Sequence, residues 1–283
     1  MITLQNVKKD YPGFTLDLTS LNLPENRITG LVGTNGSGKT TTFKLILGLI
    51  KPDGGKISVM NESAWMMPVS VKEKIGVVFP DSGFLACLCP KDIRAILKAF
   101  YPDFDPDCFD ALCRKMDLPM NKPIEQFSTG MTVRMKLIAA ISHNPQVLIL
   151  DEPTAGLDIL ARNSILELLQ DYMEKPGRSV LISSHIASDL EKICDDFYLI
   201  DEGKIILQET VDAIQNEYGV LIVSEDQFKN LDQDTVLAWK KGANGYRVLV
   251  SDRQFYQENN PGLVMEKGGI DDLIVILEEG ERK

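Results

Sequence analysis

The chain has 283 residues, of which 44% are hydrophobic and 25% are charged, and this ordinary globular composition excludes a disordered or a fibrous protein. Asp and Glu outnumber Lys and Arg by 41 to 30, so the net charge of −11 repels phosphate backbones and disfavours a general nucleic-acid binder. No apolar run approaches the ~20 residues that span a bilayer, so we expect no transmembrane segment.

The first residues and the cysteines predict the compartment. The N-terminus, Met-Ile-Thr-Leu-Gln-Asn-Val-Lys-Lys-Asp, lacks the apolar stretch of a secretory signal. The five cysteines include no Cys-x-x-Cys pair, which fits a reducing environment. We therefore expect a cytoplasmic protein.

A strand, a glycine-rich loop and a helix follow one another near the N-terminus. Residues 27–32 form an apolar run typical of a buried strand, and the apolar spacing over residues 39–50 predicts a helix. The loop between them, Gly33-Thr-Asn-Gly-Ser-Gly-Lys-Thr40, fits the phosphate-binding pattern G-x-x-x-x-G-K-[ST]. Its position between a strand and a helix disfavours a chance glycine loop.

Each residue type in this loop has a chemical reason. Glycines let backbone N–H groups converge on phosphate oxygens, and the following helix presents the positive end of its dipole. Lys39 is expected to reach the β and γ phosphates, and the Thr40 hydroxyl is expected to bind Mg²⁺. The predicted nucleotide contacts are Gly33, Asn35, Gly36, Ser37, Gly38, Lys39, Thr40 and Thr41.

Residues from about 84 to 142 are predicted to be mostly helical. Asp105 followed by Pro106 is typical of a helix start, and the apolar residues after it recur on one helical face. Further on, Ser128-Thr129-Gly130 opens another helix at about Gly130, where a hydroxyl and free N–H groups would make a second anion site. An ordinary N-cap is an equally good interpretation of Ser128.

Residues 145–209 return to alternating strands and helices. Residues 147–152, Val-Leu-Ile-Leu-Asp-Glu, form an apolar strand that ends in two carboxylates, which are unfavourable there unless a cation or a water uses them. Asp151 is therefore the candidate Mg²⁺ ligand, and Glu152 is the candidate general base. His185 ends another predicted strand, and although a lone histidine is usually structural, these neighbours favour a catalytic role. His143 lies at a predicted helix end, and we assign it no catalytic role.

The segment from about residue 210 has a different composition, with Asn and Gly punctuating short strands. Residues 221–228 resemble residues 248–255, and each stretch predicts a strand that enters a helix through a capping box, at Ser224 and at Ser251. A duplicated unit and two independent uses of the same capping chemistry both explain the similarity.

The order of these motifs resembles that of the ATP-binding cassette (ABC) ATPases over residues 1–209. The phosphate loop comes first, followed by the signature at Ser128, then Asp151-Glu152, then Ala155-Gly-Leu-Asp158, then His185. The resemblance implies that two cassettes, identical or different, pair head to tail with ATP between the phosphate loop of one and the signature of the other.

The same resemblance implies roles for single residues. Ser128 and Gly130 would contact the γ-phosphate across the interface, and Asp158 would help to form that interface. His185 would contact the γ-phosphate and orient the attacking water. Tyr11 would stack on adenine, although a plain turn residue before Pro12 is the alternative.

Two motifs depart from the family's pattern. The signature reads Phe-Ser-Thr-Gly-Met where the commonest form is Leu-Ser-Gly-Gly-Gln, so Thr129 and Met131 replace Gly and Gln. Pro80 stands where the family usually has a Gln that touches Mg²⁺ and relays movement to the transporter. The adjacent Asp81 is a hard oxygen donor and is expected to substitute as a catalytic residue. These departures affect the expected rate of ATP hydrolysis and its coupling to the transporter, but not the expected binding of ATP.

These observations predict an α/β fold: a P-loop ABC ATPase core with a RecA-like parallel sheet and an antiparallel β part. The nucleotide-binding domain would cover residues 1–209, with an inserted helical subdomain at about 84–142, and a small α+β extension would cover residues 210–283. The pattern resembles most the ATPase subunits of type-2 bacterial exporters. This implies an ATP- and Mg²⁺-dependent ATPase that drives a separate membrane-spanning permease from the cytoplasmic face of the membrane.

Two other classes of function also use ABC cassettes. A soluble ABC ATPase of a non-transport assembly, such as cofactor biogenesis, would share every catalytic motif. A DNA-repair or ribosome ATPase would need a long coiled coil or two cassettes, and the chain has one cassette and no sustained heptads. The acidic charge also disfavours that class, so no nucleic-acid partner is expected.

Overall fold

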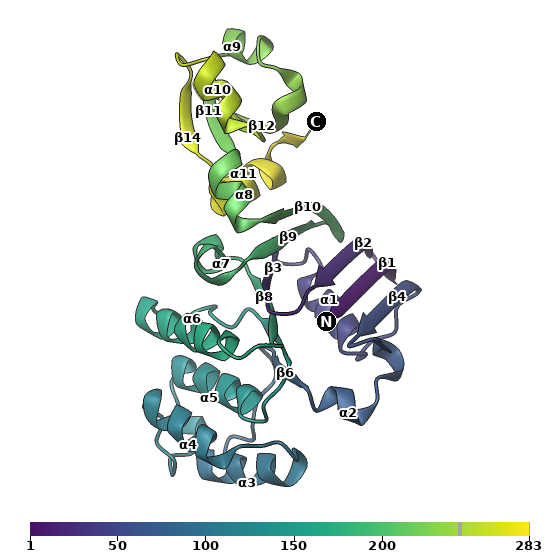
Figure 1. Ribbon diagram of the computed structural model, residues 1–283, viewed down its shortest axis with the longest axis vertical. Helices are drawn as coiled ribbons and strands as arrows, with labels where there is room; N and C mark the ends of the chain where they lie inside the picture. The colour runs from purple at the N-terminus through teal and green to yellow at the C-terminus, as the bar shows by residue number, and fades with distance from the viewer. Residues whose placement is uncertain (243–244, 283) are drawn as a thin grey trace.

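The computed structural model describes residues 1–242 and 245–282. The chain forms three sheets: the sheet of the C-terminal part lies at one end of the long axis of the molecule, and the other two sheets lie beside each other (Figure 1). Among the described residues, no helix has both the length and the apolar character needed to cross a bilayer.

A six-stranded sheet forms the centre. Its strands are β3 (Ile28–Val32), β6 (Ile75–Val78), β7 (Val147–Asp151), β8 (Ser179–Ser184), β9 (Asp196–Asp201) and β10 (Lys204–Thr210), in the order β10-β9-β3-β8-β7-β6. All neighbours run parallel except β10, which pairs antiparallel with β9. Strands β3, β7 and β8 are buried at every residue because both faces of the sheet are covered.

An antiparallel sheet and one helix cover the first face. The sheet consists of β1 (Ile2–Tyr11), β2 (Phe14–Leu23), β4 (Gly54–Val59) and β5 (Glu62–Ser63), in the order β2-β1-β4-β5. Its apolar residues share one core with α1 (Lys39–Ile46) and with β7 and β8. Helix α1 ends at Ile46 rather than at residue 50 as predicted, because Gly48 turns the chain at φ +65. A short 3-10 turn η1 (Ala64–Met66) and α2 (Val69–Lys72) follow the sheet.

Helices cover the second face. They are α5 (Thr129–Ile141), α6 (Ile159–Met173) and α7 (Ala187–Ile193), and their apolar residues share a core with the central strands. Beyond α5 lie α3 (Pro90–Phe100), α4 (Pro106–Lys115) and the 3-10 turn η2 (Ile124–Gln126), away from the sheet (Figure 1). Asp105 caps α4 as predicted, since its carboxylate accepts hydrogen bonds from the N–H groups of Asp107 and Cys108.

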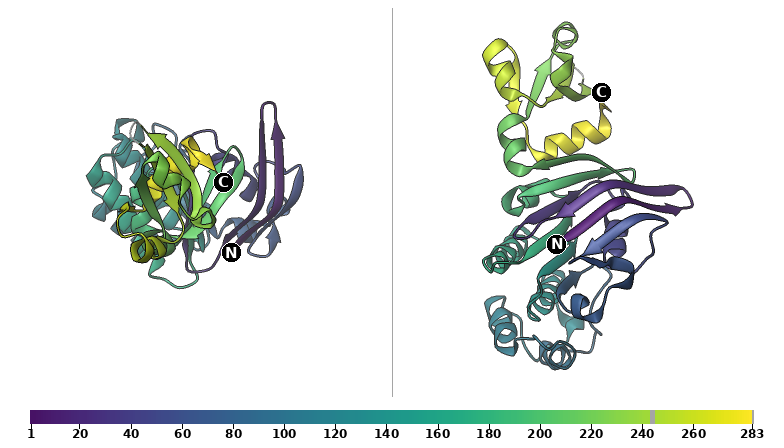
Figure 2. Two further views of the ribbon diagram at one scale, coloured as in Figure 1. Left: turned by 90° about the horizontal axis from the view of Figure 1, so that it is seen from above. Right: turned by 45° about the vertical axis from the view of Figure 1, so that its right-hand side comes forward.

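The C-terminal part starts with α8 (Val211–Glu217), directly after β10. Its strands β11 (Gly219–Val223), β12 (Val236–Gly242), β13 (Gly245–Val250), β14 (Val264–Lys267) and β15 (Glu281–Arg282) form an antiparallel sheet in the order β14-β11-β13-β12-β15. The helices are α9 (Glu225–Lys229), η3 (Gln233–Thr235), α10 (Arg253–Asn259) and α11 (Ile270–Glu279). Helix α11 lies between this sheet and the central sheet (Figures 1 and 2), and its apolar face shares a core with α7.

The two predicted capping boxes have different outcomes. At Ser224 the prediction is confirmed, because the side chains of Ser224 and Gln227 each accept the other's backbone N–H. At Ser251 it is wrong. Helix α10 is capped by Asp252, whose carboxylate accepts the N–H of Phe255. Asp caps a helix as well as Ser does, so the helix starts one residue later.

Candidate functional site

The glycine-rich loop connects the end of β3 to the start of α1. At Gly33 a Cβ would lie 2.1 Å from the carbonyl oxygen of Ile200, and at Gly38, the N-cap of α1 with φ +116, it would lie 2.6 Å from the side chain of Leu16. Both positions therefore require glycine. Among the described residues, no side chain caps α1 and no acidic residue lies in its first turn. Its free N–H groups and positive dipole end suit an anion.

Lys39 points into this loop. Its side chain is 6% exposed, and Nζ donates to the carbonyl oxygens of Gly33 (2.6 Å) and Thr34 (3.1 Å). The same nitrogen lies 3.4 Å from Oε1 of Glu152. A buried ammonium group is thus held between the loop and the carboxylate that follows β7.

Two hydroxyl groups hold the carboxylate of Asp151 at the end of β7. Thr40 donates to Oδ2 at 2.7 Å, and Ser183 donates to Oδ1 at 2.6 Å. Oxygen atoms of this type are the ligands that Mg²⁺ prefers, so Thr40 and Asp151 fit a magnesium site. Ser183 was not singled out from the sequence, although it pairs in register with Asp151 across β7 and β8.

Glu152 occupies a constrained position. Its backbone has φ +50, which is uncommon for a residue with a side chain, and its N–H donates to the Ser183 hydroxyl at 3.0 Å. Nδ1 of His185 donates to Oε2 at 2.6 Å, while Oε1 faces Lys39. The carboxylate is 14% exposed and can take a proton from a water beside it.

The remaining predicted contacts lie at the starts of two other helices. Ser128 caps α5, and its hydroxyl accepts the N–H of Met131 at 3.2 Å, so the ordinary N-cap interpretation holds within this chain. Asp158 caps α6 and accepts the N–H of Ala161 at 2.8 Å. A Cβ at Gly130 would lie 3.5 Å from that of Ala161, so the two helix starts adjoin.

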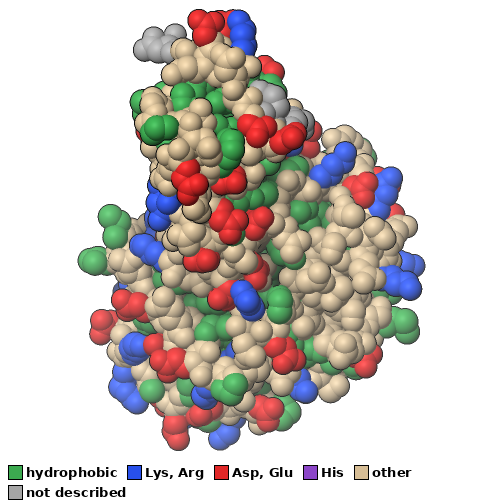
Figure 3. Space-filling view, turned by 45° about the horizontal axis from the view of Figure 1, so that its top comes forward, with side chains coloured by type: hydrophobic (Ala, Val, Ile, Leu, Met, Phe, Trp, Pro, Cys, Tyr) green, Lys and Arg blue, Asp and Glu red, His purple; other side chains and the backbone are tan. Residues whose placement is uncertain are grey.

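A cavity of about 710 Å³ adjoins the first half of the loop. Residues 34–37 line it together with Phe14, Asp17, Asp201 and Glu202, but Tyr11 does not. Tyr11 ends β1 and is 40% exposed, with Nζ of Lys9 at 5.8 Å from the ring centre. Phe14, which pairs with Tyr11 across the β1–β2 turn, is the aromatic residue that lines this cavity, and the stacking of Tyr11 on adenine stays a prediction. Acidic side chains also gather between the projecting C-terminal part and the rest of the chain (Figure 3).

Comparisons with known proteins agree with this geometry. The family model of ABC transporters matches residues 16–155. The uncharacterized ABC transporter ATP-binding protein YhaQ of Bacillus subtilis (strain 168) is 30% identical over 273 residues, which cover 91% of this chain and 89% of that protein. This chain belongs to the ABC transporter ATP-binding proteins.

Two further similarities are informative. The Nod factor export ATP-binding protein I of Burkholderia orbicola (strain AU 1054) is 30% identical over 230 residues, 78% of this chain and 75% of that protein. A solved ATP-binding subunit of an ABC transporter has the same fold, with a TM-score of 0.70 at 24% identity, covering 83% of this chain and 96% of that one. Family membership confirms the predicted fold class and an ATP-binding, ATP-hydrolysing chain, and it does not favour the non-transport alternative.

The departure at Pro80 lies in the loop between β6 and α3. Lys136 on the signature helix α5 donates to the carbonyl oxygens of Phe79 (3.1 Å) and Pro80 (2.8 Å). Burial lowers the pKa of Lys136, and the charge of Asp81 acts against this shift. Asp81 itself is exposed and makes no hydrogen bond or ion pair within the described parts of the chain. Its role beside Mg²⁺ therefore stays a prediction.

The variant Asp81→Ala tests that prediction. We expect ATP hydrolysis to slow by roughly 10-fold, the usual effect of losing a residue near a bound metal, while ATP affinity is retained. Steady-state hydrolysis and equilibrium nucleotide binding measure the two effects. Asp103→Ala, which removes another exposed carboxylate, is the control. Wild-type kinetics in Asp81→Ala would make Asp81 an ordinary loop residue.

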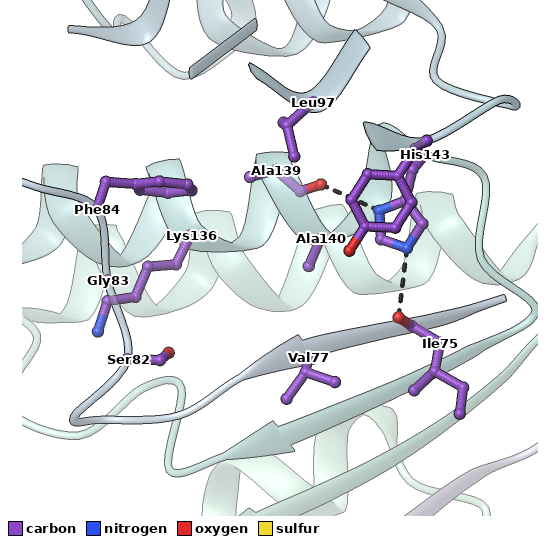
Figure 4. Close-up of a pocket in the computed structure, with 11 residues that line it drawn as sticks. Ile75, Val77, Ser82, Gly83, Phe84, Leu97, Lys136, Ala139, Ala140 and His143 are labelled. Carbon is purple, nitrogen blue, oxygen red and sulfur yellow. Dashed lines mark hydrogen bonds between the residues drawn. The ribbon is translucent and has the colours of Figure 1, made fainter. Parts of the chain in front are cut away.

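A cavity of about 240 Å³ lies beside the same loop, between β6 and the helices α3 and α5 (Figure 4). Its lining is mostly apolar and includes Phe84, Leu97 and Lys136. His143 closes one end: its ring nitrogens lie 3.3 Å from the carbonyl oxygens of Ala139 and Ile75, and its ring stacks on Tyr101 at 4.1 Å between centroids.

Burial lowers the pKa of His143 below 6.5, although its two backbone partners act in the opposite direction. The unfolded chain therefore binds this proton more readily than the folded one, so stability is retained above about pH 6.5 and falls as the pH is lowered. We expect a loss of up to about 1.4 kcal/mol of unfolding free energy per pH unit from this group.

Urea unfolding of the wild type and of His143→Gln between pH 7.5 and pH 5 would measure this loss as a difference in slope. The other histidine, His185, is present in both proteins, so any contribution that it makes to the slope cancels in this comparison. Equal slopes in the wild type and His143→Gln would contradict the prediction.

Proposed function

We propose that this chain is the ATP-hydrolysing subunit that drives a separate membrane-spanning permease, and that the complex is an exporter. The observation that carries ATP hydrolysis, the first part of this proposal, is the position of Glu152, between the Lys39 ammonium group at 3.4 Å and the His185 imidazole at 2.6 Å. In this place one carboxylate adjoins a phosphate-binding cation and a proton-sharing ring, as hydrolysis of a phosphoanhydride requires.

In this proposal the triphosphate occupies the loop of residues 33–41. The N–H groups at the start of α1 and the Lys39 ammonium group bind the phosphate oxygens. Thr40 and Asp151 hold Mg²⁺, which supplies charge neutralisation on the phosphates when bound. Glu152 accepts a proton from the attacking water, and His185 orients that water next to the γ-phosphate.

A second cassette completes the site. Ser128, Gly130 and Asp158 lie at the starts of α5 and α6 and make no contact with the phosphate loop within the described chain. Beside Asp158, the side chains of Ile159 and Leu160 are 73% and 81% exposed. Apolar side chains that are this exposed next to polar capping residues suit a protein–protein interface. We infer a dimer, with an identical or a related cassette.

The permease would contact the groove beside the loop of residues 79–85. The apolar cavity opens there, and the nearby side chains of Leu85 and Phe100 are 72% and 75% exposed. The contact would hold the chain at the cytoplasmic face of the membrane. The direction of transport follows the relative named for Nod factor export, and this analogy supports an exporter.

The decisive experiment is a gentle purification of the tagged chain from its native cells after the membranes are solubilised. A multi-span membrane protein in stoichiometric amount is the expected companion. Leu85→Asp should lose this companion and keep ATP binding, whereas Ile222→Asp, an equivalent change on the C-terminal sheet, should retain it. Recovery of only soluble partners, with ATP hydrolysis intact, would contradict the permease assignment and favour a non-transport assembly.

A further inference from the structure

The last helix, α11, connects the C-terminal part to two elements of the nucleotide site. At the first residue of α11, the N–H of Ile270 donates to the carboxylate of Glu191 at 2.7 Å. Glu191 lies on α7, the helix that follows His185. At its other end, the N–H of Thr34 in the phosphate loop donates to the carboxylate of Glu278 at 3.2 Å. The final strand adds an ion pair between Arg282 and Asp201.

Packing fixes this placement. Ile270, Leu273, Ile276 and Leu277 of α11 are buried and share a core with the central strands and α7. The right-hand view of Figure 2 shows α11 at the base of the C-terminal part, next to the central sheet. Glu278 therefore reaches the loop from a helix that is itself anchored.

Three charged side chains act on the carboxylate of Glu278. Lys39 attracts its carboxylate, Asp201 repels it, and Arg282 attracts it from β15. Burial raises the pKa of Glu278, and the hydrogen bond from Thr34 acts in the opposite direction. A carboxylate is thus placed within the field of the ammonium group that points into the phosphate loop, and it occupies one N–H of that loop.

We infer that Glu278 is a residue of the nucleotide site that the C-terminal part contributes, and that its negative charge lowers the affinity for nucleotides in proportion to their phosphate charge. The inference rests on the proposal that the loop of residues 33–41 holds the triphosphate. Two anionic groups near one cation repel each other, so each weakens the binding of the other. By reciprocity, a bound triphosphate weakens the contact between Glu278 and the loop by the same factor.

As a consequence, the binding of a nucleotide and the attachment of the C-terminal part to the phosphate loop affect each other. When the site binds ATP, the Thr34–Glu278 contact weakens, while the Ile270–Glu191 anchor at the far end of α11 carries no such repulsion. The C-terminal part therefore holds the phosphate loop more firmly without ATP than with it. This gives residues 211–282 a part in nucleotide affinity.

The test compares Glu278→Gln with the wild-type full chain in equilibrium titrations with MgATP and MgADP. The amide keeps an oxygen that accepts the Thr34 N–H but removes the charge. We expect Glu278→Gln to bind MgATP about 5-fold more tightly, at the low end of typical coupling between sites, with a smaller gain for MgADP. Glu281→Gln, an equal charge change at an exposed position in β15, should bind both nucleotides as the wild type does.

Each other outcome has a definite meaning. If Glu278→Gln binds MgATP no more tightly than the wild type, or gains equally for both nucleotides, the charge mechanism is overturned. Hydrogen exchange at residues 278–282 of the wild type gives a second measurement that needs no variant, and it should accelerate when MgATP is added. If Lys39→Ala leaves MgATP binding intact, the proposed phosphate site itself fails, and this result is distinguishable from a failure at Glu278 alone.

Discussion

Replacing Glu152 with Gln is expected to slow ATP hydrolysis by at least about 100-fold, the lower range of what a general base contributes, while ATP remains bound. The amide cannot accept the proton of the attacking water. Its oxygen can still accept the hydrogen bond from His185, which lies 2.6 Å from the carboxylate, so the site should keep its shape. Removal of one negative charge beside Lys39 also favours the triphosphate.

The bound ATP should then hold two cassettes together. Single-turnover hydrolysis measures the rate, and size-exclusion chromatography with and without MgATP measures the dimer, which should accumulate only in Glu152→Gln. Glu167→Gln, an equal charge change at an exposed position on α6, should turn over normally and stay monomeric after hydrolysis. Normal turnover in Glu152→Gln would show that another group is the base.

The parts of the site that the sequence predicted are those fixed by local rules. Positions 33 and 38 require glycine because their φ angles are positive and because a Cβ would clash with neighbouring atoms. The glycines of the motif therefore predict the local backbone conformation of the loop. Asp151 ends β7 and His185 follows β8, two parallel neighbours in the central sheet, and the carboxyl ends of such strands meet at one edge. For these residues the sequence pattern was sufficient to predict where they lie, and their roles in catalysis stay predictions.

Other features depend on distant contacts that no local pattern encodes. Ser183 reaches Asp151 only because β7 and β8 pair in one particular register. Thr34 and Glu278 meet although 244 positions separate them, because packing places α11 against the central sheet. The early end of α1 likewise follows from the turn at Gly48, where a Cβ would lie 2.2 Å from the carbonyl oxygen of Ala64.

Replacing Lys39 with Ala is expected to weaken ATP binding by about 100-fold, because one buried ammonium group makes charge-assisted hydrogen bonds to the phosphates and such bonds are each worth about 1.5–3 kcal/mol. Its side chain is only 6% exposed, so the contact is little screened by solvent. Equilibrium titration with MgATP measures the loss. Lys44→Ala, on the exposed side of the same helix, is the matched control and should bind as the wild type does.

The same substitution also changes the protein without nucleotide, because it removes the ammonium partner of the Glu152 carboxylate and leaves His185 as its ion-pair partner within the described chain. A carboxylate that is 14% exposed and loses its ammonium partner destabilises the fold, so thermal unfolding of Lys39→Ala without nucleotide must accompany the titration. The double variant Lys39→Ala/Glu152→Gln separates the two effects, since it removes both charges. It should recover stability but not ATP affinity, and recovered affinity would mean that the lysine acts on Glu152 rather than on the phosphates.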